Sequence, residues 1–224
     1  MEREAAVKTS RTKLKRLPKR GHYDFDTIAR ILDEALYCHI GFVENGQPYV
    51  MPMAFGRDGD RLYVHGSVAG RTLKTLASGI PLCVTVTHFD GLVFARSGFH
   101  SSINYRSVII LGKAVLLQGE EKYRAMDVII DHLMPGQRPA LRATTRKEWN
   151  ATSILMIPIE EASAKIREGG PKDDADDYSL PVWAGVLPFR LVAEEPVPDA
   201  NGVSMSLPDH IKDYRRPGAP HRPQ

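Results

Sequence analysis

Short alternating segments separated by tight-turn dipeptides limit this chain to an antiparallel β fold. Asn45-Gly46, Asp58-Gly59 and Asp90-Gly91 each stand between two stretches in which apolar and polar residues alternate. Asn-Gly and Asp-Gly are preferred dipeptides of two-residue hairpin loops. A parallel pair of strands needs a crossover of a dozen or more residues, so these turns favour neighbouring strands that run in opposite directions.

The predicted elements are mostly short strands, with a few helices between them. Asp24 or Asp26 is expected to cap the first helix. The segment 173–177 is expected to be a solvated loop, and the apolar segment 181–189 is expected to be buried. Because strands and helices do not alternate regularly, we expect a mainly β fold with peripheral helices, a closed or partly open antiparallel barrel. Strands are predicted over 38–43, 47–55, 61–65, 81–87, 92–97, 105–117 and 152–159, and helices over 24–35, 68–79, 120–133 and 160–167.

Charge divides the chain into an arm, a domain and a tail. Residues 1–20 hold eight basic side chains against two acidic ones, whereas all 224 residues together have a net charge of +3. We therefore expect a basic arm over 1–20, one domain with a full core over 21–191, and a polar, proline-containing tail over 192–224. A basic arm can bind nucleic acid. No aromatic residues lie between these charges, so we expect no nucleic-acid partner.

The hydropathy pattern leads us to expect a cytoplasmic protein. No apolar run approaches the length of a membrane span, and the N-terminal segment lacks the apolar core of a secretory signal. We therefore expect a cytoplasmic location and no membrane partner.

Cys38 and Cys83 lie in apolar, strand-like runs without a CxxC pair or a clustered histidine. Both are expected to be buried free thiols, and no metal site is expected.

The segment 62–74 has the composition of an anion site. An alternating strand leads into Gly66 and Ser67, and a helical pattern follows at once. Ser67 stands where a helix N-cap is expected, and a helix N-terminus presents unpaired N–H groups to an anion. Gly66 allows close approach to the backbone, and Arg71 can bind the same anion. The alternative is an ordinary capped helix with a solvated arginine.

Seven motifs in the same order resemble those of a known family. They are Ile31-Leu-Asp-Glu-Ala, Cys38-His-Ile-Gly-Phe, Gly46-Gln-Pro-Tyr-Val-Met-Pro-Met53, Leu62-Tyr-Val-His-Gly-Ser67, Cys83-Val-Thr-Val-Thr87, Asn104-Tyr-Arg-Ser-Val108 and Val182-Trp-Ala-Gly-Val-Leu-Pro188. Over about residues 18–190 the chain resembles the flavin-nucleotide-binding proteins related to pyridoxamine 5′-phosphate oxidase, the FMN-binding split β-barrels. Within them it is most similar to the nitroimidazole-resistance branch.

This resemblance implies a homodimer with FMN in a groove at the dimer interface. It places the flavin phosphate on the segment examined above, and it places the flavin ring between two strands. A third strand begins near the same groove, where Arg106 could add a second charge to the phosphate. An aromatic residue near the C-terminal end would pack beside the flavin, or else belong to the core. The phosphate residues are His65, Gly66, Ser67 and Arg71. The ring residues are Pro52, Met53 and Ala54 on one strand and Cys83, Val84 and Thr85 on the other. The third strand begins with Tyr105, Arg106 and Ser107, and the aromatic residue is Trp183.

The residues support a cofactor pocket rather than a catalytic set. The resemblance implies a flavin-dependent oxidoreductase that reduces a small organic acceptor, with hydride supplied by NAD(P)H. His65 is the first candidate for the histidine assigned near the flavin in the resistance branch, and His100 the second. The C-terminal sequence from Tyr214 does not match the arginine-rich segment of pyridoxamine phosphate oxidases proper, so vitamin B6 oxidation is not expected. The alternatives are a non-enzymatic flavin-binding or storage protein, and haem or deazaflavin in the same groove.

Overall fold

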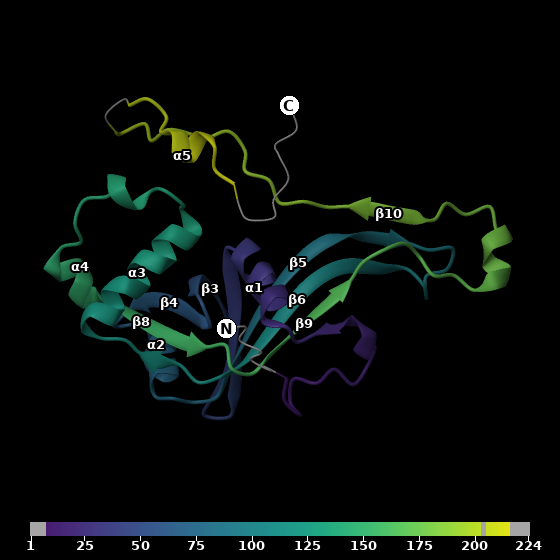
Figure 1. Ribbon diagram of the computed structural model, residues 1–224, viewed down its shortest axis with the longest axis horizontal. Coiled ribbons are helices and arrows are strands. Elements are labelled where there is room, and N and C mark those ends of the chain that lie inside the picture. Colours follow the sequence, from purple (N-terminus) through teal and green to yellow (C-terminus); the bar gives the residue numbers. More distant parts are fainter. Residues whose placement is uncertain (1–7, 203–204, 216–224) are drawn as a thin grey trace.

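The computed structural model describes residues 8–202 and 205–215, which form one antiparallel sheet curled into a barrel (Figure 1). Along the sheet the strands follow the order β1-β9-β6-β5-β2-β3-β4-β8-β7, and β10 pairs with β5 off this path. The strands are β1 (Gly21–His22), β2 (Tyr37–Glu44), β3 (Gln47–Asp58), β4 (Arg61–Ser67), β5 (Leu82–Phe94), β6 (Ser102–Gly112), β7 (Val115–Leu116), β8 (Thr152–Pro158), β9 (Ala162–Arg167) and β10 (Gly185–Pro188). The expected mainly β fold is confirmed.

The helices lie around the barrel. They are α1 (Phe25–Glu34), α2 (Arg71–Ala77), α3 (Gly119–Leu133), α4 (Arg146–Ala151) and α5 (Asp209–Lys212), with short 3₁₀ turns at Pro18–Arg20, Arg138–Ala140 and Ala175–Ser179. Of the two predicted caps of the first helix, Asp24 and Asp26, it is Asp24 that caps α1. Its carboxylate accepts a hydrogen bond from the Thr27 N–H at 2.8 Å. This hydrogen bond lowers the pKa of Asp24.

The core is built from the inward-facing residues of the strands, closed by one face of α1. Successive strand side chains point to opposite faces, and the buried residues that β2 and β5 contribute to the barrel core are apolar. The 45–46 turn fixes the β2–β3 register, since Asn45 and Gly46 both have positive φ (51° and 81°), as a type I′ hairpin loop requires. The fully buried core residues include Ile28, Leu32, Ile40, Phe55, Leu62, Val64, Val84, Ile110, Leu155 and Ile157.

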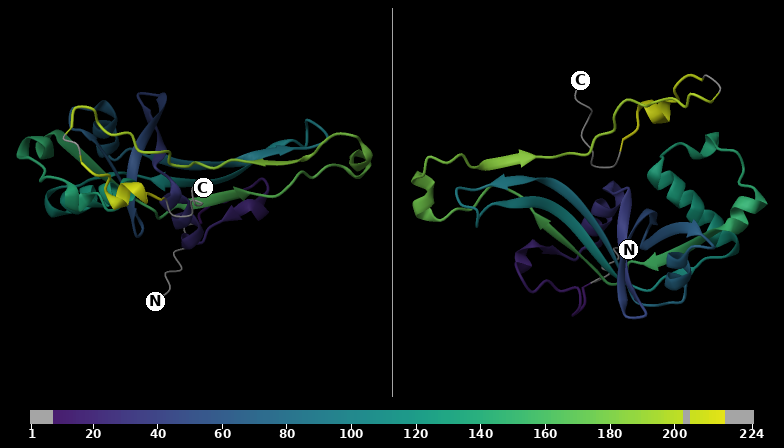
Figure 2. Two further views of the ribbon diagram at one scale, coloured as in Figure 1. Left: turned by 90° about the horizontal axis from the view of Figure 1, so that it is seen from above. Right: turned by 180° about the vertical axis from the view of Figure 1, so that it is seen from behind.

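Beyond the barrel, β5 and β6 extend together as a long two-stranded ribbon, referred to as the β5–β6 arm. Figure 1 shows this arm with β10 beside it, and the two views of Figure 2 show the same extension. The arm corrects one prediction: Asp90-Gly91 is not a hairpin turn. β5 runs through it as one strand with a bulge between Phe89 and Gly91. Gly91 is needed because a Cβ there would lie 2.7 Å from the carbonyl oxygen of Leu187 on β10.

Three further predictions differ from the structure, two of them because of long-range packing. Residues 162–167 form β9 rather than a helix, because Ala162 and Ala164 turn inward against the core while the backbone pairs with β6. In the predicted solvated loop, the carboxylate of Asp173 has no exposed surface and binds Arg96 at 2.9 Å. The apolar segment 181–189 was expected to be buried, but most of its large side chains are exposed in the single chain.

The described parts of the basic N-terminal arm and of the C-terminal tail both contact the domain. Arg11 pairs with Glu161, and the Leu14 N–H donates to the Tyr23 hydroxyl at 2.8 Å. In the tail, the Tyr214 hydroxyl donates to the carbonyl of Leu133 at the end of α3. Residues 1–7 of the expected arm, and 203–204 and 216–224 of the expected tail, lie outside the described residues. In the described chain no helix is both long and apolar enough to cross a membrane.

Candidate cofactor site

A gap along one edge of β5 opens the barrel. β2 pairs with β5 only over 82–85, ending with His39 opposite Thr85. Farther along the same edge, β10 pairs with 91–94. Among the residues that the structure describes, no strand pairs with 86–89 on this edge. The strand therefore presents a stretch of unpaired edge between β2 and β10.

A cavity of about 680 Å³ lies at this gap. Its volume falls in the range of small-molecule and cofactor sites. The end of α1 and the start of β2 form one side, the bulged part of β5 and Arg106 of β6 form another, and the chain after β10 forms a third. The first wall comprises residues 34–37 and His39, the second comprises residues 87–90 and Arg106, and the third comprises residues 188–191.

Three charged side chains are locked together in the cavity wall. Arg106 donates to both carboxylate oxygens of Asp90, at 2.9 and 3.0 Å, and also to Glu34. These hydrogen bonds raise the pKa of the Arg106 guanidinium above its usual value. The sequence predicted a phosphate contact for Arg106. Its donors instead join α1, β5 and β6, so a phosphate would have to compete with two carboxylates.

Two histidines line the cavity, and they differ in their bonding. The Nε2 atom of His88 lies 2.9 Å from the carbonyl oxygen of Ile31, so that ring is fixed against α1. The ring of His39 packs edge-on against Tyr37, with ring centroids 5.6 Å apart. Its imidazole makes no hydrogen bond with another described residue. His39 is thus a half-buried imidazole with free ring nitrogens at the edge of the gap.

The predicted flavin-ring residues divide between the two faces of the sheet. Strand register places Pro52, His39 and Thr85 in one row on the outer face. Val84, in contrast, is fully buried in the core, and Met53 packs against the core from the other face. The outer face thus brings together four of the six predicted residues and adds two that the sequence did not single out. The four are Pro52, Ala54, Cys83 and Thr85, and the two are Tyr37 and His39.

The predicted phosphate seat has a different local structure from the one expected. Ser67 ends β4 and its hydroxyl accepts the Ala69 N–H at 3.2 Å, while Gly70 is the N-cap of α2. The predicted N-cap at Ser67 is therefore wrong. Gly66 has a packing reason: a Cβ there would lie 2.8 Å from the Leu73 side chain, so its small size lets α2 approach β4.

Arg71 and His65 flank this turn. The Arg71 guanidinium lies 4.7 Å from the centre of the Tyr49 ring and 3.8 Å from Glu44, and its side chain is 65% exposed. It is therefore a weakly held cation that an anion could recruit. The pKa of His65 is lowered by partial desolvation.

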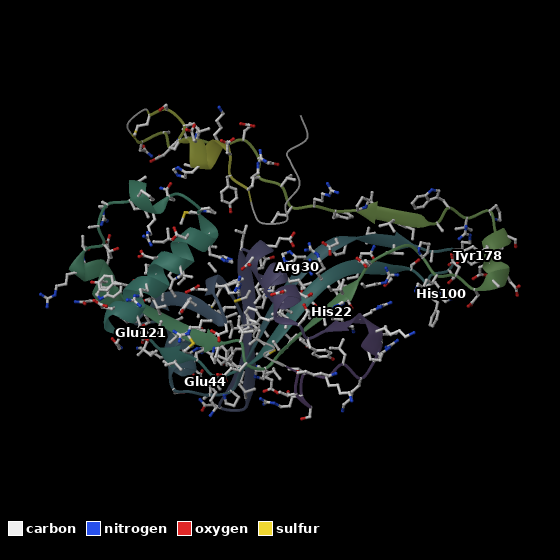
Figure 3. All side chains as sticks on the ribbon, in the orientation of Figure 1. His22, Arg30, Glu44, His100, Glu121 and Tyr178 are labelled. Carbon is white, nitrogen blue, oxygen red and sulfur yellow. The ribbon has the colours of Figure 1, made fainter. Side chains whose placement is uncertain are left out.

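The remaining predicted residues lie toward the β5–β6 arm. Tyr105 and Ser107 pair with Phe89 and Thr87 across the cavity wall. Trp183 is 69% exposed and packs edge-on against Phe94, with ring centroids 5.7 Å apart. The second candidate histidine, His100, lies toward the outer end of the β5–β6 arm, as Tyr178 does (Figure 3), with its Nε2 atom 3.3 Å from the Asp174 carboxylate. It does not line the cavity.

The two cysteines differ in accessibility, and neither joins a metal cluster in the described part of the chain. Burial raises the pKa of Cys38 to about 12, and it also raises the pKa of the half-buried Cys83. Cys38 is thus the buried free thiol that was expected.

We expect iodoacetamide at neutral pH to label Cys83 slowly and to leave Cys38 unlabelled until the protein unfolds, because the thiolate is the reacting species. Peptide mass spectrometry measures the two sites separately, and Cys83→Ser is the control. Faster labelling of Cys38 in the native protein would contradict its placement in the core.

Comparison with protein families matches residues 24–166 to pyridoxamine 5′-phosphate oxidase. Among solved structures, the flavocytochrome Anf3 from Azotobacter vinelandii is 41% identical, with 93% of this chain and 98% of that chain covered and a TM-score of 0.88. The FAD and haem binding protein from Mycobacterium smegmatis is 34% identical, covering 88% and 98%, with a TM-score of 0.85. A putative 5-nitroimidazole antibiotic resistance protein from Bacteroides thetaiotaomicron is 24% identical, covering 65% and 86%, with a TM-score of 0.56. Comparison with curated proteins gives no match.

Proposed function

The chain belongs to the pyridoxamine 5′-phosphate oxidase family, and we propose that it is a redox protein that binds a flavin and a haem. Two relatives support this pair of cofactors, because one is a flavocytochrome and the other binds FAD and haem. The observation in this chain that carries the proposal is the histidine-bearing cavity at the β5 gap. The split-barrel fold expected from the sequence agrees with these relatives.

The cavity has the chemistry that a haem requires. Haem is a flat, apolar ring with an iron at its centre and carboxylates on one edge, and its iron takes a histidine nitrogen. Here Phe89, Phe189 and Leu191 supply apolar wall, and His39 supplies a free imidazole. Arg190, at the same cavity, has no ion-pair partner among the described residues and would pair with the carboxylates.

The outer face of the sheet fits the flavin. Pro52 and Ala54 of β3 provide small side chains on this face, beside β2, and Arg71 provides a cation for a phosphate. We propose FAD as the flavin, since a 34% identical protein binds FAD. FMN, the expectation from the sequence, is the alternative.

These two cofactors would supply complementary redox chemistry. A flavin accepts a hydride equivalent, and a haem iron exchanges single electrons. The residues of this chain hold the two groups and set their surroundings. The proposed activity is that of an oxidoreductase which uses a reduced nicotinamide nucleotide and reduces a small acceptor. A non-enzymatic flavin protein is the second candidate.

The purified protein tests this proposal directly. The absorption spectrum and the pyridine haemochrome assay measure haem per chain, and chromatography of acid-released flavin distinguishes FAD from FMN. We expect both haem and FAD after reconstitution, and bleaching of the flavin band on addition of NADH or NADPH. A protein that binds flavin but no added haem refutes the haem part. Flavin that neither nucleotide reduces favours the non-enzymatic candidate.

Arg71→Ala is expected to weaken FAD binding about tenfold and to leave riboflavin binding unchanged. A charge-assisted contact to phosphate contributes roughly 1.5–3 kcal/mol, and the exposure of Arg71 places it at the low end. Fluorescence titration of the flavin-free protein measures both constants. Lys74→Ala, on the same helix, is the matched control. Equal losses for FAD and riboflavin would place Arg71 away from the phosphate.

We also propose that the chain works as a homodimer joined through the outer face of the sheet. Tyr37, Val43, Val50 and Ile109 expose apolar side chains on this face, with exposed fractions from 41% to 66%. Apolar side chains exposed together on one face are typical of an interface, and twofold dimers are the commonest solution. Light scattering should show a dimer, and Val50→Glu should convert it to a monomer. A wild-type monomer that retains its cofactors refutes this proposal.

A further inference from the structure

An iron ligand in this cavity must offer a ring nitrogen that is not already bonded, at a place that a flat ring can reach. Histidine is the commonest metal ligand because its neutral imidazole has one free lone pair. The walls of the cavity hold two histidines, His39 and His88. The choice between them rests on the face of the sheet that each occupies.

His88 is held on the inner side. It lies opposite Arg106 in the β5–β6 register, and the side chains at these two positions share the face that packs on α1. Its Nε2 is bonded to Ile31, and its immediate surroundings contain the Arg106 cluster with Asp90 and Glu34. With Nε2 bonded to the Ile31 carbonyl, His88 could offer an iron only Nδ1, and only on the inner face that packs on α1.

His39 is placed on the outer side, at the end of the β2–β5 pairing. Beyond Thr85, β5 loses β2 as a partner, so the imidazole stands at the rim of the gap rather than within a continuous sheet. Tyr37, two residues earlier on the same face, packs edge-on against the ring. Such a contact limits the ring's rotation without using either nitrogen.

Part of the cavity wall is apolar and aromatic. Phe89 and Phe189 pack edge-to-face with ring centroids 5.1 Å apart. Phe189 is held there because its N–H donates to the carbonyl of Asp90 at 3.0 Å, which continues the β10 pairing past the bulge. The aromatic pair is thus fixed by backbone bonds and provides a surface on which a porphyrin can stack.

We infer that His39 is an axial ligand of the haem iron in this protein, with the Phe89–Phe189 pair packed against the ring. The inference rests on the proposed haem binding and adds the residue that holds the iron. It also places the haem next to the proposed flavin seat, because His39 pairs with Pro52 of β3 on one side and with Thr85, at the gap, on the other.

Haem titration of three full-length proteins tests this inference: wild type, His39→Ala and His88→Ala. The readouts are haem per chain, the position of the Soret band, and the circular dichroism spectrum as a measure of intact fold. We expect His39→Ala to lose at least tenfold in haem affinity while it keeps the wild-type circular dichroism spectrum, and His88→Ala to keep a wild-type Soret band. Added imidazole should restore the wild-type band in His39→Ala, since a free imidazole can replace a missing ligand but not a missing packing contact.

The outcomes separate the inference from the proposed function. If wild type binds no haem, the proposed haem function fails. If wild type binds haem and His39→Ala has the same affinity and the same band, the inference alone is overturned. Loss of the band in His88→Ala with retention in His39→Ala would assign the iron to the other histidine. Should His39→Ala fail to fold, His39→Met decides: a shifted band supports ligation, and an unchanged band overturns it.

Discussion

Arg106→Ala is expected to lower the free energy of unfolding by about 2–3 kcal/mol. Removing Arg106 takes away the guanidinium that donates to both carboxylate oxygens of Asp90. Removing one partner of a charge pair typically costs about 3–5 kcal/mol when the pair is fully buried. The side chain of Arg106 is 32% exposed and that of Asp90 is 31% exposed, so water recovers part of this. Urea unfolding followed by circular dichroism measures the difference.

Two comparisons show whether the effect comes from the lost charge compensation. Arg138→Ala breaks an exposed pair with Asp127 and should change stability by less than about 1 kcal/mol. The triple variant Arg106→Leu, Glu34→Gln, Asp90→Asn removes all three charges and should recover most of the lost stability. If the triple variant is no more stable than Arg106→Ala, the guanidinium contributes packing rather than charge compensation.

The elements that the sequence predicted well are those fixed by neighbouring residues. Asn45-Gly46 specified a hairpin because both residues adopt positive φ at little strain, and Asp24 specified the start of α1 through a hydrogen bond three residues away. The strand alternation then placed most of the core. These signals act within a few positions, so one chain is enough to reveal them.

The incorrect predictions all depend on distant segments. Asp90-Gly91 has the composition of a turn, but β10, almost a hundred residues later, pairs alongside and makes it a bulge. Ser67 has the composition of a cap, yet it still pairs with Thr152 of β8, so the strand continues through Ser67 and the helix begins later, after Gly70. Local propensity is outweighed in both places by tertiary contacts.

The candidate site was only partly predictable for the same reason. The phosphate and ring segments were found from motifs, but the gap that forms the cavity exists only because β2 and β10 share one edge of β5. His39 stood inside a quoted motif without an assigned role, since nothing nearby in the sequence shows that β5 loses its partner there. A cavity made by two strand ends is visible only in the folded chain.

Gly56→Ala is expected to lower the free energy of unfolding by about 3 kcal/mol, through a clash between two backbones. A Cβ at Gly56 would lie 2.7 Å from the Ile129 Cα and 2.8 Å from the Val128 carbonyl oxygen on α3. Neither atom can rotate away, so α3 must move off β3, and overpacking of this kind costs 1–3 kcal/mol or more.

The matched control is Gly112→Ala, another strand glycine, whose Cβ would find its nearest neighbour at an ordinary 3.9 Å. There the substitution should raise stability by up to about 1 kcal/mol, because alanine restricts the unfolded chain more than glycine does. Urea unfolding of the two variants should thus shift in opposite directions from wild type. A common shift would mean that α3 does not pack on β3 through Gly56, and the buried cluster of Tyr63, Ala125 and Ile129 beneath the helix would then need another explanation.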